Sequence, residues 1–278
     1  TPQLADLFAQ VPPLKKLEIS VYGMRPKSYD ADACTPGAYH EFRRGLDLLL
    51  DRQVPFVLKS VLLPPNRDEI DEFESWAATI SWMDRNPGYA VFLDLRARRD
   101  SPSKNRLIRK LRFSPEEGLA LLTRDEQAYR REMAQYIQSG FVRPEGDFLF
   151  SCGAGDSGCI DAYGSYQMCL SLRHPDTVFD LQDHTLQQVL TQEFPRLQAL
   201  KATNPSFLNR CARCFLRGLC EQCPAKSWME HGTLDTPVEY HCQIAHVQAR
   251  FLGLLDEGEK AWQVQNWQER TKTFVENT

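Results

Sequence analysis

Nine cysteines are the residues of this chain whose type and spacing suggest chemistry. Four of them lie within residues 211–223, in the run RCARCFLRGLCEQC. The spacing C-x2-C, which lets two sulfurs reach one metal from a single turn, occurs twice there. The two pairs are Cys211 with Cys214 and Cys220 with Cys223. Clustered thiols of this kind indicate metal ligands or redox centres.

A single zinc ion accounts for only part of this cysteine set. The two knuckles of a zinc ribbon are separated by about 15–20 residues, whereas only FLRGL separates the two pairs here. One zinc ion would also leave four further cysteines without a role: Cys152, Cys159, Cys169 and Cys242. Iron–sulfur clusters use four thiolates each, and eight cysteines follow residue 138. Their number therefore favours two clusters.

Composition restricts the classes of function. The chain of 278 residues has a net charge of -4 at pH 7, which gives no general support to nucleic-acid binding. No apolar run approaches the ~18 residues of a membrane span, and residues 1–16 lack the basic flank and apolar stretch of a secretory signal. We therefore expect a cytoplasmic protein with reduced thiols and with no nucleic-acid or membrane partner.

Strand and helix patterns alternate up to about residue 138. Alternating apolar side chains predict strands in residues 14–23, 55–63 and 89–96. Helical spacing predicts helices in residues 36–52, 66–83 and 114–122. The last of these begins with a predicted capping box, in which Ser114 is the N-cap and Glu117 its partner. This alternation predicts a parallel sheet, in a barrel or in a doubly wound fold.

Each predicted strand carries polar side chains on one face. They are Glu18 and Ser20, Lys59, and Asp94 with Arg96. A strand covered by helices on both faces reads instead as a nearly continuous apolar run. The polar faces suit a wide barrel that holds a cofactor or substrate, and a salt-bridged rim explains them equally well. Asp94 in particular is a candidate catalytic, substrate-facing carboxylate, with a salt bridge to Arg96 or Lys59 as its default interpretation.

The second half of the chain has little periodicity. Glycines and cysteines separate short elements there, so metal sites or covalent links must supply order. Residues 158–168, GCIDAYGSYQM, predict two short strands around a turn at Gly164.

The cysteine pattern resembles that of the SPASM domain, which follows the barrel of many radical S-adenosylmethionine (SAM) enzymes. The family pattern is C, nine to fifteen residues, G-x4-C, then C-x2-C-x5-C-x3-C and a final C. Here Cys152 is followed after eleven residues by Gly164, and then by Cys169, by the four clustered cysteines and by Cys242. One spacing departs from the pattern, because the clustered group ends in C-x2-C. In the first half, EISVYG resembles the fourth barrel strand of the family and PGAYHEFRRGLDLLL the helix after it.

The resemblance implies an α/β fold in two parts. Residues 1–138 would be the later strands of a TIM-like (β/α) barrel, and residues 139–278 a SPASM domain with two auxiliary 4Fe-4S clusters. The ligands that it implies for one cluster are Cys211, Cys214, Cys220 and Cys242. For the other cluster they are Cys152, Cys169 and Cys223, with Cys159 as the candidate fourth ligand. A small buried residue is the alternative role of Cys159, and it would leave an iron open to substrate.

The C-x3-C-x2-C triplet of the family, which binds the cluster that cleaves SAM, is absent from these 278 residues. The chain therefore resembles the C-terminal portion of a radical SAM peptide maturase, and we do not expect it to perform the radical step alone. The full-length protein would use SAM, a third 4Fe-4S cluster, a peptide or protein substrate, and a reductant such as ferredoxin or flavodoxin. The alternatives are a non-catalytic iron–sulfur electron-transfer or scaffold module and a zinc-stabilised interaction domain.

Several single residues carry weaker predictions. Ser20 matches the position from which relatives contact the SAM carboxylate, and a structural hydroxyl is its alternative. Lys59 is a candidate for binding an anionic cofactor group, and a rim ion pair is its alternative. Leu170 stands where sulfatase-maturing relatives have an aspartate, which argues against that reaction. Cys34 fits no motif and is expected to be a free thiol.

Two further groups have mainly structural interpretations. We expect His231, His241 and His246 to be surface or core histidines, because thiolates already fill both predicted sites. Residues 96–112 hold eight basic side chains against one acid. They predict either a docking site for an acidic peptide or a solvated loop followed by a helix.

Overall fold

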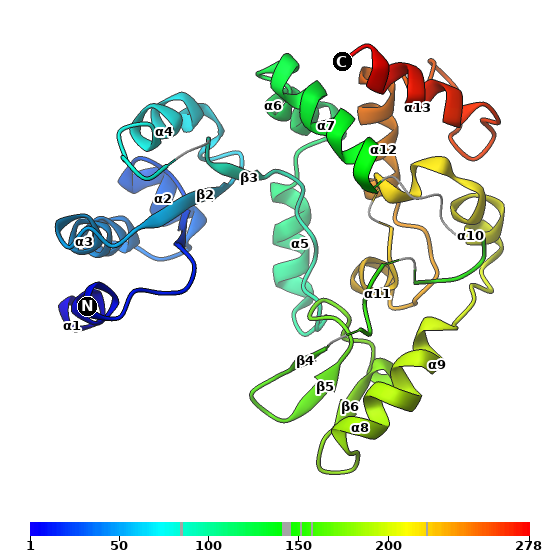
Figure 1. Cartoon of the computed structure of the whole chain (residues 1–278), viewed down its shortest axis with the longest axis horizontal. Helices are drawn as coiled ribbons and strands as arrows, with labels where there is room; N and C mark the ends of the chain where they lie inside the picture. Colours follow the sequence, from blue (N-terminus) through cyan, green and yellow to red (C-terminus); the bar gives the residue numbers. More distant parts are fainter. Residues whose placement is uncertain (84–85, 141–145, 151, 157, 221) are drawn as a thin grey trace. The chain divides into compact units, whose positions relative to one another are not determined.

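The computed structural model describes residues 1–83, 86–140, 146–150, 152–156, 158–220 and 222–278. It divides into two compact units, namely residues 1–93 with 111–113, and residues 94–110 with 114–278. The first unit holds a three-stranded parallel sheet with helices, and the second a small antiparallel sheet with helices (Figure 1). Within the described ranges, no helix has both the length and the apolar character that a bilayer crossing needs. The predicted domain boundary after residue 138 rests on sequence texture and resemblance, and it stays a prediction.

The first unit is built on the two strands whose alternation the sequence shows clearly. Its elements are α1 (Pro2–Gln10), β1 (Leu17–Val21), α2 (Pro26–Asp32), α3 (Ala38–Asp51), β2 (Phe56–Val61), the 3-10 helix η1 (Arg67–Glu69), α4 (Ile70–Ala77) and β3 (Gly88–Ala90). β1 and β2 pair in parallel, from Leu17 opposite Phe56 to Val21 opposite Ser60. The apolar faces of α3 and α4 pack with these strands into one core. The parallel sheet predicted from the alternation is therefore confirmed.

The third strand is much shorter than predicted. It covers only Gly88–Ala90, and the expectation of a strand through residues 91–96 is wrong. β2 is followed by Leu62, whose N–H donates to the carbonyl of Ala90, and then by Pro64 and Pro65. Proline has no N–H, so β2 offers no further ladder beside residues 91–96. Asp94 and Arg96 consequently do not lie on a strand.

The three strands have the order β1-β2-β3. Over the described residues they do not close into a barrel. The α/β class is therefore observed, whereas the barrel interpretation is not.

The second unit combines a small sheet with many short helices. Its elements are α5 (Pro102–Leu111, whose last residue belongs to the first unit), α6 (Pro115–Leu122), α7 (Glu126–Gly140), β4 (Cys159–Ile160), β5 (Ser165–Gln167), η2 (Pro175–Thr177), β6 (Val178–Asp180), α8 (Leu186–Gln188), the π-helical turn η3 (Val189–Glu193), α9 (Phe194–Gln198), α10 (Pro205–Asn209), η4 (Cys211–Arg213), η5 (Phe215–Gly218), α11 (Pro224–His231), α12 (Glu239–Phe251) and α13 (Trp267–Glu276). The three strands are antiparallel, in the order β4-β5-β6.

Two local predictions are confirmed in this unit. β4 and β5 form the hairpin predicted around Gly164, whose φ of 83° lies in the left-handed region that glycine adopts without a steric cost. At the start of α6, the Ser114 hydroxyl accepts from the N–H of Glu117, and the Glu117 carboxylate accepts from the N–H of Ser114. Both features depend on neighbouring residues only, which is why the sequence predicts them.

Two apolar clusters hold the second unit together. One contains Phe215 and Leu216 of η5 with Ala245 and Ala249 of α12. The other packs β5 and β6 against α9 and α11. Phe215 and Leu216 lie within the cysteine-rich segment, so this segment is itself anchored in the first cluster, and α11, which follows it, is anchored in the second.

Candidate metal centre

Four cysteines from two segments of the second unit line one pocket: Cys211, Cys214, Cys220 and Cys242. We call it the four-cysteine pocket. Its cavity volume is only about 20 Å³. The pocket is therefore tight, and its walls must move apart for a guest larger than water. Cys242 lies far along the chain from the other three, so the packing of α12 brings it here.

The local backbone explains how the first three sulfurs come together. Cys211 begins the 3-10 turn η4, Cys214 precedes the 3-10 turn η5, and Cys220 follows it. Side chains three positions apart eclipse one another in a 3-10 helix. Cys211, Cys214, Arg217 and Cys220 are each separated by three positions, although the backbone is extended at Cys214 between the two turns. Arg217 also lines the pocket.

Burial raises the pKa of all four thiols, and it is the largest cause at each. The pKa is raised to about 11 at Cys211 and to about 12 at Cys220. Neighbouring cysteines of the pocket raise the pKa further at Cys211, Cys214 and Cys220. These thiols therefore keep their protons at neutral pH, and a bound metal would have to displace them.

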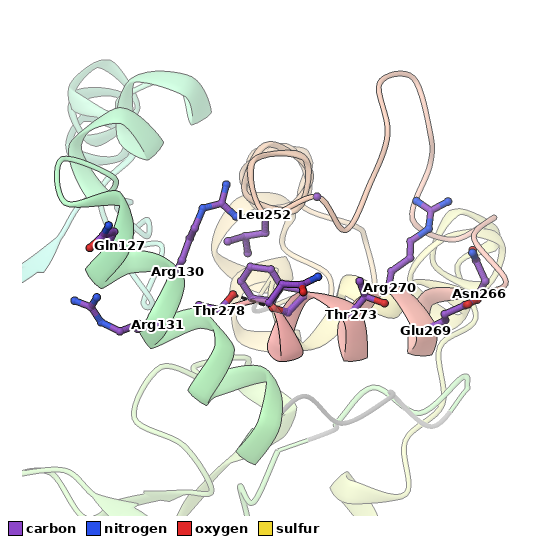
Figure 2. A pocket seen from close by; sticks show the side chains of 12 residues that line it. Gln127, Arg130, Arg131, Leu252, Asn266, Glu269, Arg270, Thr273 and Thr278 are labelled. Carbon is purple, nitrogen blue, oxygen red and sulfur yellow. Dashed lines mark hydrogen bonds between the residues drawn. The ribbon is translucent and has the colours of Figure 1, made fainter.

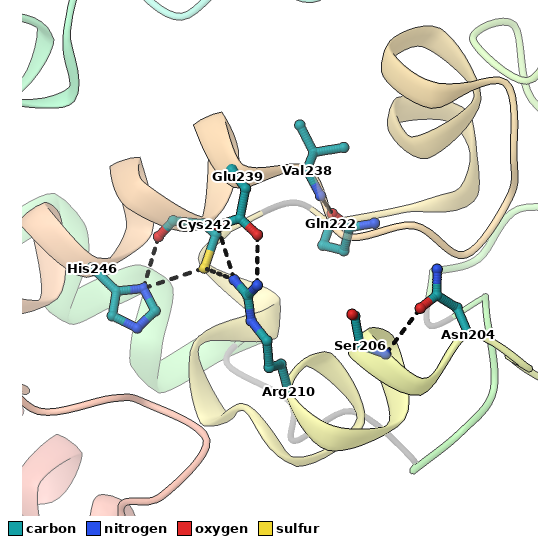
Figure 3. Close-up of polar contacts among 8 residues, drawn as sticks. All are labelled: Asn204, Ser206, Arg210, Gln222, Val238, Glu239, Cys242 and His246. Atoms are coloured by element: carbon teal, nitrogen blue, oxygen red, sulfur yellow. Dashed lines mark hydrogen bonds and ion pairs between the residues drawn. The ribbon is translucent and has the colours of Figure 1, made fainter.

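One wall of the pocket carries a charged network around Cys242 (Figure 3). Arg210 donates from Nη1 and Nη2 to the two carboxylate oxygens of Glu239, at 2.5 and 3.0 Å, and from Nη2 to the Cys242 sulfur at 3.4 Å. His246 donates from Nδ1 to the carbonyl of Cys242 at 2.7 Å, while its Nε2 accepts from the N–H of Ala261 at 3.3 Å. Both ring nitrogens are therefore engaged, as expected for a core histidine.

The second predicted ligand set is only partly assembled. Cys223 is the N-cap of α11, and its side chain makes no capping hydrogen bond there. Burial raises the pKa of Cys223, Lys226 opposes this effect, and Cys152 adds a smaller increase. Cys169 borders the same apolar cluster as Cys223.

Cys159 lies on β4, opposite Gln167 of β5, and raises the pKa of Tyr166 after the larger effect of burial. It is partly buried, and its ligand role stays a prediction.

The cysteine sulfurs are the potential metal donors of this unit. All nine cysteines are free thiols. Among the described residues, however, no three cysteine, histidine or acidic side chains converge closely enough to hold one metal ion. The four-cysteine pocket therefore offers the right donor chemistry for an iron–sulfur cluster, namely four sulfurs around a shared space.

Asp94 has partners that the sequence did not indicate. Its Oδ1 accepts from Nζ of Lys226 at 3.3 Å and from Nε2 of His241 at 3.2 Å. Burial opposes ionisation of this carboxyl, but His241 and Lys226 outweigh it and the pKa of Asp94 is lowered. The predicted salt bridge to Arg96 or Lys59 is wrong, because these cations pair with Asp100 and Glu18. No local pattern connects Asp94 with α11 and α12, so the sequence carried no signal for this trio.

The two candidate cofactor-binding residues of the first unit lie beside each other in the sheet. Ser20 on β1 is opposite Lys59 on β2. Lys59 Nζ donates to Glu18 Oε2 at 2.5 Å, which agrees with the ion-pair interpretation. At the following loops, the buried Glu69 accepts from the N–H of Met24 and from Ser28 Oγ. This edge of the sheet is thus held by hydrogen bonds within the protein.

Several basic residues of the segment 96–112 are engaged within the protein. Arg99 donates to the carbonyls of Trp228 and Met229, at 2.6 and 3.1 Å. Arg109 pairs with Glu230, and Arg98 lies 3.8 Å from Asp161. These contacts favour a structural role for this segment.

The remaining residues with predictions from the sequence are Cys34, the three histidines and Leu170. Cys34 is an exposed free thiol. His231 is exposed, whereas His241 and His246 are buried. Leu170 is 64% exposed.

A larger cavity of the second unit contains no predicted ligand. It has a volume of about 870 Å³ and is lined by residues of α7 and α13 and by Leu252 and Gly253 (Figure 2). Two of its arginines are already paired, Arg130 with Glu126 and Arg270 with Glu259. We assign no function to this cavity.

Comparison of the chain with models of protein families, with curated proteins and with solved structures finds no match. The arrangement of the cysteines is therefore the strongest guide to function.

Proposed function

We propose that this chain is the cluster-binding C-terminal portion of a radical SAM maturase, with two auxiliary 4Fe-4S clusters. The observation that carries the proposal is the four-cysteine pocket. Its four sulfurs are the ones that the SPASM resemblance groups into one cluster, and Cys223, although adjacent in sequence, is excluded from it. Spacing alone would have grouped Cys223 with Cys220, so the pocket is an independent argument for the family's partition.

Each protein group has a defined part in this proposal. Cys211, Cys214, Cys220 and Cys242 would hold one cluster, and Arg210 would donate a hydrogen bond to the Cys242 sulfur. The second cluster would be held by Cys152, Cys159, Cys169 and Cys223. A bound 4Fe-4S cluster supplies one-electron transfer or a binding site for substrate. In the full-length protein, residues 1–138 would complete a barrel that binds SAM and a peptide or protein substrate.

Iron and sulfide quantitation on anaerobically purified protein tests the metal assignment. We expect about eight irons per chain, from two four-iron sites, and a charge-transfer absorption in the visible region. C220S and C223S should each lower the iron content by about half, because each removes a ligand of a different site. C34S is the matched control and should keep the full content. Colourless protein after anaerobic reconstitution would refute the proposal.

The same preparation separates the alternatives. Zinc in place of iron under strict anaerobic conditions would identify a zinc-stabilised domain. Iron without an upstream C-x3-C-x2-C triplet in the native reading frame would identify a non-catalytic iron–sulfur module. Iron together with that triplet, and with reductive cleavage of SAM by the full-length protein, is the outcome that we expect.

A further inference from the structure

Arg217 is a buried cation whose contacts with the described residues are made to neutral groups. Only 3% of its surface is exposed. Its Nη2 donates to the carbonyls of Phe148 and Leu149, at 2.6 and 3.0 Å, and its Nη1 to the carbonyl of Gly146 at 3.3 Å. The guanidinium carbon lies 4.9 Å from the centre of the Phe207 ring. These contacts orient the guanidinium but leave its charge without compensation.

The contrast with Arg210 shows what is missing. Arg210 shares the pocket wall, and its charge is neutralised by the carboxylate of Glu239. Within the described part of the chain, Arg217 has no carboxylate partner, whereas the buried Nε lacks a hydrogen-bond acceptor in both arginines. An unpaired buried charge is costly, so proteins bury one where an opposite charge is available or will bind. The surroundings of Arg217 therefore point to an anion in the pocket.

The thiols alone do not provide that anion. Arg217 lines the same pocket as the four cysteines. An ordinary thiol is mostly protonated, and therefore neutral, at pH 7. Four thiolates around a 4Fe-4S cluster, in contrast, carry a net negative charge, which grows by one on reduction. A cluster is thus an anion that matches the cation in charge and position.

We propose that Arg217 is the fixed counter-charge of the cluster in the four-cysteine pocket and raises its reduction potential. This inference rests on the proposed function, since it requires a cluster at this site. A nearby cation stabilises the more negative, reduced state more than the oxidised state. Burial keeps solvent from screening this effect, and the carbonyl contacts prevent the guanidinium from turning away. Arg217 acts here as a positioning residue, because its described contacts are with protein groups.

The test compares a charge deletion with a charge-conserving substitution. R217M removes the charge and R217K keeps it. Both are prepared in a C223S background, so that only the four-cysteine pocket holds a cluster. An opposite charge within roughly 4–6 Å shifts a protonation equilibrium by about 1–3 log units. By analogy we expect R217M to lower the reduction equilibrium constant at least about tenfold, which is about 59 mV for a one-electron couple. Midpoint potentials come from redox titration followed by electron paramagnetic resonance.

A matched control distinguishes burial from charge as such. R213M removes an arginine from the same segment, but Arg213 is exposed and solvent screens its charge. We expect R213M and R217K to keep nearly the parent midpoint potential. Their reduction equilibrium constants should lie within about threefold of the parent value. An R217M protein that loads iron fully and keeps the parent potential overturns the inference while the proposed function stands. A parent protein without iron fails the proposed function itself.

Failure of R217M to assemble is also informative. If R217M is folded but empty while R217K loads a cluster, the charge is required and the inference is supported. If both are folded and empty, the shape of arginine matters instead of its charge, and the inference is overturned. If R217M does not fold, R217Q replaces it, because its amide keeps a donor for the carbonyls without a charge. If neither uncharged variant folds in the absence of iron, Arg217 is a structural anchor and the inference is again overturned.

Discussion

The pH dependence of the metal-free protein tests whether the thiols are buried around the pocket as described. Burial, together with nearby cysteines, raises the pKa of Cys220 from its ordinary value of 9.0 to about 12. A raised pKa means that the folded state holds the proton more tightly than the unfolded state. The resulting stability is fully present below pH 9 and is lost as the pH rises towards 12. Metal-free protein should therefore become less stable above pH 9.

The size of this loss is nearly independent of how far the pKa is raised. At pH 10 the thiol is largely ionised in the unfolded chain and almost fully protonated in the folded protein. This difference in protonation lowers the free energy of unfolding at pH 10 by about 1.4 kcal/mol. A folded-state pKa of about 11 gives nearly the same value. Cys211, with a pKa raised to about 11, should contribute a similar amount.

The assay is urea unfolding of iron-free, fully reduced protein at pH 7 and at pH 10. Lysines and tyrosines also titrate over this range, so the comparison is between variants. C220S should lose about 1.4 kcal/mol less than the wild type between the two pH values. C34S, which removes an exposed thiol, should lose as much as the wild type. Equal losses in C220S and the wild type would show that Cys220 is not buried in the pocket, and the description of the site would fail.

Two further predictions concern the scaffold. R99A removes the hydrogen bonds to the carbonyls of Trp228 and Met229 and should lower the free energy of unfolding in urea by about 1–3 kcal/mol. The control R98A changes an exposed arginine and should lower it by less than about 1 kcal/mol. In the first unit, burial and then Glu69 raise the pKa of Asp32 from 3.8 to about 6, so stability is lost as the pH rises through 6. D32N should remove that loss and gain stability relative to the wild type at pH 7 but not at pH 4; equal gains at both would contradict it.

The cysteine set shows how far spacing can predict a site. The type and number of the cysteines indicate two metal sites, and the resemblance implies how the cysteines divide between them; both stay predictions. Arg217 was missed, although a signal was present, because it continues the three-residue spacing of Cys211, Cys214 and Cys220. Only the folded structure shows that this arginine is buried and that it lacks a carboxylate partner among the described residues. Its burial depends on packing against residues 146–149 and Phe207.

Local features were determined by the amino-acid sequence itself. The alternation of β1 and β2, the capping box at Ser114 and the hairpin at Gly164 each depend on residues a few positions apart, whose preferences act in any context. The tertiary structure decided where β3 ends, which cations surround Asp94, and that Cys242 lines one pocket with Cys211, Cys214 and Cys220 whereas Cys223 does not. These outcomes depend on contacts between segments far apart in the chain, where packing and desolvation outweigh local preference.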